Sequence, residues 1–209
     1  MKQEASMQII ILLINAIVQA ILFSIIPFVW WLICGRKESG FVKWLGLKKP
    51  IVKNKFKYSI TFLFTIIFML IPGVLIVPLF IDKSIMATSQ FSGQGISAII
   101  PALIYAFLQT GFSEELFFRG FLTKRLIHKL GFKVGNTVQG LLFGLMHGIL
   151  FISKAGLIGT IIIILLTGIV GWLMGWINEK QSDGSIVSSW LIHGCANTLA
   201  AIIAMFNIS

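Results

Sequence analysis

Long hydrophobic stretches dominate the chain and are separated by short polar or basic segments. A helix needs about 20 mostly apolar residues to span the hydrocarbon layer of a bilayer. Six stretches meet or approach that length: Ile9–Ile33, Tyr58–Ile81, Ile96–Phe112, Val134–Ile152, Ala155–Ile177 and Ile186–Ile208. The pattern predicts an all-α, polytopic membrane helix bundle with about six to seven transmembrane helices, in which residues 1–209 form a single integral-membrane domain. Glycines four apart, as at Gly140 and Gly144, predict close helix packing.

The composition excludes the main alternatives to a membrane protein. Of the 209 residues, 57% are hydrophobic and 11% are charged, which does not suit an ordinary soluble globular domain. The 18 phenylalanines among long aliphatic runs exclude a disordered chain. The two cysteines, Cys34 and Cys195, lie in separate hydrophobic stretches and give no disulfide framework.

The net charge of +10 is concentrated in two segments. Residues 35–57 carry eight basic side chains against one acidic one, with aromatic residues between them, so we expect anionic lipid rather than nucleic acid as their partner. Residues 124–133 form a second basic segment. The positive-inside rule places both segments in the cytoplasm and both termini, with residues 82–95, outside. The first stretch is too long for a cleaved signal peptide, and we expect a multi-pass protein of a bacterial cell membrane.

Polar residues inside the predicted spans gather at three places: residues 113–119, 143–147 and 193–197. Burying an ionisable group in a membrane helix costs about 2.5–3.5 kcal/mol, so such groups indicate a function. In the first cluster, Glu115 and Arg119 are four residues apart and can pair, whereas Glu114 points about 100° away. An unpaired carboxylate in that setting is suited to exchange protons. Alternatively, Gly111 ends a helix and Ser113 caps an interfacial one.

Two histidines lie inside the other apolar clusters. A single intramembrane histidine is often only a hydrogen-bonding residue between helices. Here His147 follows Phe143 by one turn, and Asn197 follows His193 by one turn, so two further helices present polar faces. A purely structural bundle has little reason to keep two histidines, a free glutamate and an asparagine.

Water is the nucleophile that fits these residues best. No aspartate lies in a span to complete a Ser-His-Asp triad, and Cys195 lies on the opposite helix face from His193. Glu114 held with His147 can deprotonate a water for attack on a peptide carbonyl. His193 and Asn197 can donate hydrogen bonds to the developing oxyanion. No metal or other cofactor is required.

In order along the chain, the three clusters match Glu-Glu-x-x-x-Arg, Phe-x-x-x-His and His-x-x-x-Asn. The sequence from about Ile96 to Ile203 thereby resembles the CPBP family of CAAX prenyl endopeptidases and bacteriocin-processing enzymes, also called the Abi family. The resemblance implies an intramembrane endopeptidase acting on a membrane-associated peptide or protein, with Glu114 and His147 activating water and His193 and Asn197 forming the oxyanion hole. Glu115, Arg119 and Phe143 complete the motifs as supporting residues. The longer CAAX enzymes have eight spans, so the substrate does not carry over.

Two other functions remain open from the sequence. A zinc metalloprotease would use Glu114, His147 and His193 as ligands, although it lacks a His-Glu-x-x-His helix and leaves Asn197 without a task. A non-catalytic membrane protein would confer bacteriocin immunity by occupying a peptide or receptor. Glu114→Gln separates this binding function from the enzyme, because the substitution preserves shape and removes the base.

Overall fold

The computed structural model describes residues 2–208, and all regular structure within them is helical. The α-helices are α1 (Lys2–Trp30), α2 (Phe41–Trp44), α3 (Lys55–Leu75), α4 (Ile99–Leu103), α5 (Ser113–Glu115), α6 (Lys124–Gln181) and α7 (Val187–Met205). Wider π-helical segments occupy Trp31–Gly35, Ile104–Phe112 and Leu116–Thr123. Short 3₁₀ turns follow α3 and precede α4, at Val77–Leu79, Lys83–Ile85, Ala87–Phe91 and Gly95–Ala98. The predicted all-α class is confirmed.

Four helices in the described chain are long and apolar enough to cross a membrane, so the predicted count of six to seven is not confirmed. These helices are Met7–Gly35, Lys55–Leu79, Gly95–Gln181 and Val187–Met205. The difference arises in the third, an 87-residue helix that contains three of the predicted stretches. Its backbone leaves helical geometry at Gly131 (φ 75°, ψ 166°) and Gly156 (φ 64°, ψ 178°). Glycine adopts these angles readily, so the chain changes direction there without a long loop.

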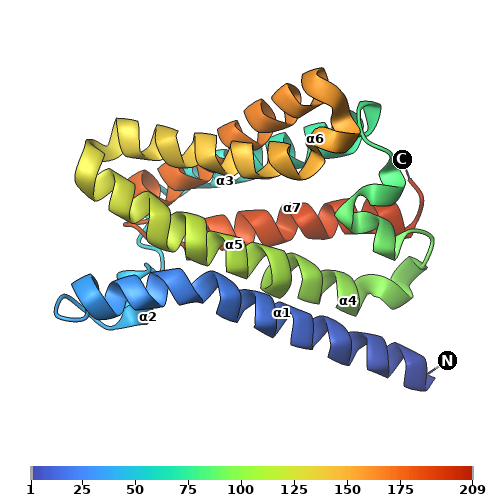
Figure 1. Cartoon of the computed structure of the whole chain (residues 1–209), viewed down its shortest axis with the longest axis horizontal. Coiled ribbons are helices and arrows are strands. Elements are labelled where there is room, and N and C mark those ends of the chain that lie inside the picture. Colours follow the sequence, from blue (N-terminus) through green and yellow to red (C-terminus); the bar gives the residue numbers. More distant parts are fainter. Residues whose placement is uncertain (1, 209) are drawn as a thin grey trace.

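The helices form one bundle in which α7 lies between other elements (Figure 1). α7 packs against α3, against α6 and against the π-helical segment Ile104–Phe112, and α1 packs on the other side of that segment. Both termini lie at one end of the bundle, whereas α2 and the first bend of α6 lie at the opposite end (Figure 1). The relative placement of the termini and the two basic segments agrees with the alternation expected from the sequence.

The two arms of α6 on either side of Gly156 approach each other closely. A Cβ atom at Gly144 would lie 2.3 Å from the backbone oxygen of Ile164, which leaves no room for a side chain. The close packing predicted from the glycine spacing is therefore confirmed. Two fully buried amides also join the arms: Gln139 Nε2 donates to Gly171 O at 2.9 Å, and Asn136 Nδ2 donates to Trp172 O at 2.9 Å. The sequence analysis did not single out these amides.

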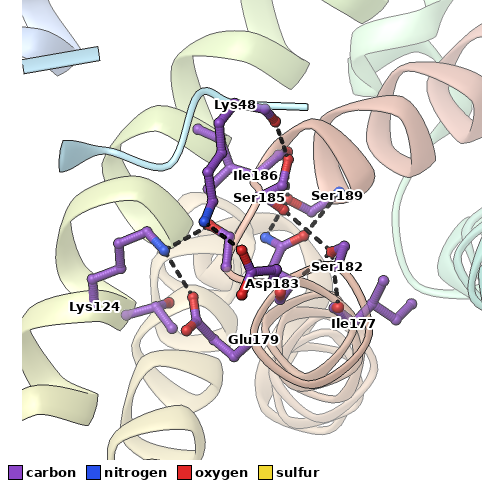
Figure 2. Close-up of polar contacts among 12 residues, drawn as sticks. Lys48, Lys124, Ile177, Glu179, Ser182, Asp183, Ser185, Ile186 and Ser189 are labelled. Carbon is purple, nitrogen blue, oxygen red and sulfur yellow. Dashed lines mark hydrogen bonds and ion pairs between the residues drawn. The ribbon is translucent and has the colours of Figure 1, made fainter. Parts of the chain in front are cut away.

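A network of hydrogen bonds and ion pairs lies at the end of the bundle that carries the basic segments (Figure 2). Lys124 Nζ donates to Glu179 Oε1 at 2.9 Å and to Gly184 O at 2.8 Å. Lys48 Nζ, from the basic 35–57 segment, donates to Asp183 Oδ2 at 2.8 Å. That hydrogen bond and the lysine charge lower the pKa of Asp183. The network joins the segment after α1, the start of α6 and the turn between α6 and α7.

Candidate active site

The first polar cluster lies on α5, between two π-helical segments. The backbone stays helical through Ser113 (φ −62°, ψ −46°), and the Ser113 hydroxyl faces Leu108 O rather than capping a helix. The alternative in which Gly111 ends one helix and Ser113 starts another is therefore wrong. π-helical turns frequently occur at functional sites because they widen the helix and redirect side chains. Gly111 suits this turn, since a Cβ atom there would lie 2.5 Å from Ala106 O.

Glu115 and Arg119 form a buried ion pair, with Arg119 Nη1 2.9 Å from Glu115 Oε1. Both residues are 1% exposed, and the pair matches the prediction from their spacing. Glu115 Oε1 also lies 3.1 Å from Nδ1 of His193 on α7. The Arg119 guanidinium lies over the Phe143 ring, 4.1 Å from its centroid. One dry cluster thus connects all three polar motifs, and spacing along a single helix did not predict the contact between Glu115 and His193.

Glu114, the neighbouring carboxylate, has a different environment. It is half-buried and lines a cleft, and its Oε2 atom, like Oε2 of Glu115, has no hydrogen-bond partner among the described residues. His147 lines the same cleft, and its Nδ1 lies 2.9 Å from Phe143 O. Because a carbonyl oxygen only accepts hydrogen bonds, Nδ1 carries the proton. In the neutral ring, Nε2 is then the nitrogen that can accept a proton.

Asn197 on α7 and Thr110 on the π-helical segment Ile104–Phe112 face each other. Asn197 Nδ2 donates to Thr110 Oγ1 at 3.0 Å, and both side chains line the cleft. Thr110 is a site residue that the sequence analysis missed. The signal was present, because Thr110 precedes Glu114 by four residues and so lies near it on a helical face.

The cleft has a volume of about 740 Å³ and combines apolar walls with a polar floor. Glu114, His147, His193 and Asn197, the four residues predicted as catalytic, all contribute to its lining. Glu115, Arg119 and Phe143 lie behind the cleft, where each is almost fully buried. An apolar cavity with a few convergent polar groups is typical of a binding or active site.

The predicted zinc ligand set is not supported by the arrangement of these side chains. Within residues 2–208, no group of three or more His, Cys, Asp and Glu side chains is placed to hold a metal ion. Glu114, His147 and His193 share the cleft without converging on one point within ligand distance.

Fold and site together define an all-helical membrane protein with a polar site at the floor of an internal cleft. A family model described as type II CAAX prenyl endopeptidase Rce1-like matches residues 96–199, which include every predicted site residue. The chain belongs to the CAAX protease (CPBP) family, and the match supports a peptide hydrolase. No curated protein and no solved structure matches the chain significantly.

Proposed function

We propose that this protein is an intramembrane endopeptidase that hydrolyses a peptide bond of a membrane-associated protein or peptide. The observation that carries the proposal is the shared cleft, in which Glu114, His147, His193 and Asn197 meet from three separate parts of the chain. Hydrolysis inside a bilayer requires a water, a base and an oxyanion site in one cavity. The residue types around the cleft supply the base and the oxyanion donors.

Glu114 and His147 are the proposed water-activating pair. The Glu114 side chain lines the cleft, where its carboxylate can accept a hydrogen bond from a water. The bond from His147 Nδ1 to Phe143 O orients the ring and leaves Nε2 for proton transfer. The water loses its proton to this pair as it attacks the carbonyl carbon, and the proton passes to the amine that leaves when the C–N bond breaks.

His193 and Asn197 are the proposed oxyanion donors. Glu115 accepts from His193 Nδ1 and also pairs with Arg119, so it orients an imidazole that lines the cleft and that, in its protonated form, donates from Nε2 to the oxyanion. Asn197 uses one amide hydrogen on Thr110 and keeps the second for substrate. Removing one such donor typically lowers the rate about 100- to 1,000-fold.

The proposed topology has six membrane crossings. The bends at Gly131 and Gly156 divide the 87-residue helix into three arms, and even the shortest arm, residues 132–155, extends about 36 Å at 1.5 Å per residue. Each arm is then long enough for the roughly 30 Å hydrocarbon layer. The basic segments are cytoplasmic in this topology, and the protein lies in the cell membrane of a bacterium.

Anionic lipid is the proposed partner of the 35–57 segment. Phe56 is 78% exposed and Ile51 is 59% exposed, between exposed lysines at 49, 53, 55 and 57. Exposed apolar rings among basic side chains suit the headgroup level of an anionic leaflet. We expect the triple change of Lys53, Lys55 and Lys57 to glutamine to reduce co-purification of phosphatidylglycerol, measured by mass spectrometry of bound lipid.

The catalytic proposal is tested by Glu114→Gln, His147→Ala and His193→Ala. Each variant should abolish cleavage while the protein still accumulates in membranes, measured by mass spectrometry of membrane-associated peptides. His128→Ala is the matched control, because His128 is the third histidine and is exposed outside the cleft. An unchanged peptide profile in Glu114→Gln would refute hydrolysis by this site, and a retained immunity phenotype would favour binding alone. Loss of activity on exhaustive chelation with rescue by zinc would favour a metalloprotease.

A further inference from the structure

The lining of the cleft extends from the polar site toward one end of the bundle. Its outer lining comes from the segment after α3 and from the chain after α7, including Lys83, Ser89 and Asn207. Lys83 and Asn207 are exposed and Ser89 is partly exposed. These segments lie at the end of the bundle that carries both termini (Figure 1).

The opposite end contributes nothing to the cleft lining. No lining residue belongs to the basic segments 35–57 and 124–133 or to the turn between α6 and α7. The network around Lys124 and Asp183 fills that end (Figure 2), and Ser182, Ser185 and Ser189 within it are fully buried. On α7, the lining begins at His193 and continues only toward the end of the helix.

The charge distribution gives these two ends opposite orientations in a membrane. The closed end carries seven exposed basic side chains of the 35–57 segment: Arg36, Lys37, Lys43, Lys49, Lys53, Lys55 and Lys57. At the open end, residues 82–95 contain one acidic and one basic residue, Asp82 and Lys83. Short loops rich in Lys and Arg stay in the cytoplasm. The closed end is therefore cytoplasmic, and the open end faces the other side of the membrane.

We infer that the cleft receives its peptide from the extracytoplasmic side. This inference rests on the proposed endopeptidase function and specifies how its substrate is presented. His193 precedes Asn207 by fourteen residues, or about 20 Å along the helix axis, and an extended peptide covers that depth with about six residues. The walls along this path include Met69, Val74 and Ile203. The substrate is thus an extended, uncharged and mostly apolar segment that reaches inward from the outer surface to the scissile bond.

Thiol accessibility tests the direction of opening without any need for activity. In a background with Cys34→Ser and Cys195→Ala, single cysteines are introduced as Ala200→Cys in the cleft wall, Ser89→Cys at its mouth, and Lys49→Cys at the closed end. A membrane-impermeant maleimide added to intact cells should label the first two variants and leave the third unlabelled. In inverted vesicles, Lys49→Cys should be labelled. Labelling of Ala200→Cys from the cytoplasmic side alone, or from neither side, would overturn the inference.

The same reagents separate this inference from the proposed chemistry. Glu114→Gln added to the Ala200→Cys variant should leave outside labelling unchanged, whereas it should abolish cleavage. If the protein is labelled from outside but cleaves no peptide, the proposed endopeptidase function is refuted, whereas the inferred direction of opening is retained. In proteoliposomes, a single-span reporter with six alternating Ala and Leu residues at its outer end should be cleaved at least tenfold faster than the same peptide with a central Lys. Equal rates would overturn the apolar path.

Discussion

Replacement of glutamate by glutamine should lower the stability of the folded protein strongly at Glu115 and very little at the adjacent Glu114. Glu115 is 1% exposed, and its Oε1 meets both Arg119 and His193. Glu115→Gln keeps an acceptor oxygen and removes the charge, which leaves the buried Arg119 guanidinium uncompensated. Breaking a buried ion pair on one side costs about 3–5 kcal/mol. The folded-to-unfolded ratio should then fall by about 100-fold or more.

Glu114→Gln is the matched control, because Glu114 forms no ion pair with any residue that the structure describes. The free energy of unfolding, measured by titration with SDS in mixed micelles and followed by tryptophan fluorescence, should be close to that of the wild type. Adding Arg119→Gln to Glu115→Gln should recover part of the loss, since no unpaired charge then remains. Equal stabilities of Glu114→Gln and Glu115→Gln would refute the division between a dry structural carboxylate and a catalytic one.

Three further predictions use matched pairs of substitutions. Thr110→Val should lower kcat roughly tenfold with little change in KM in a reporter-peptide assay, because Asn197 loses the acceptor that orients it. Thr198→Val, which lies outside the cleft, should leave both constants unchanged. Gly156→Ala should lower the free energy of unfolding by about 1–3 kcal/mol, since its φ of 64° and ψ of 178° suit glycine almost alone, and Gly40→Ala at φ −61° should have little effect in the same SDS titration. Lys124→Met should lower the free energy of unfolding by about 1.5–3 kcal/mol, because the hydrogen bonds to Glu179 and Gly184 are lost. A comparable decrease in Lys129→Met, at an exposed position, would contradict this explanation.

The sequence predicted interactions within one helix better than interactions between helices. The Glu115–Arg119 pair and the close packing at Gly144 followed from residues four apart, and both are present. The contact between Glu115 and His193 joins residues 78 apart in sequence, which no helical period relates. The number of spans also required the bend angles at Gly131 and Gly156, because an apolar run does not reveal where a long helix changes direction. The π-helical turns around α5 gave no signal in the hydrophobic pattern.

In the proposed mechanism, adjacent glutamates have different roles: Glu115 forms a structural ion pair and Glu114 helps to activate water. About 100° of rotation separates neighbouring side chains on a helix, so Glu115 points into the dry cluster with Arg119 while Glu114 points into the cleft. Carboxylates take different roles when their surroundings differ, and here Glu114 lines the cleft whereas Glu115 contacts a fixed cation. Because His193 touches Glu115 and also lines the cleft, the dry cluster orients part of the proposed oxyanion site. The His193 imidazole therefore links the Glu115–Arg119 ion pair to the proposed oxyanion site. Loss of that ion pair should lower kcat as well as stability.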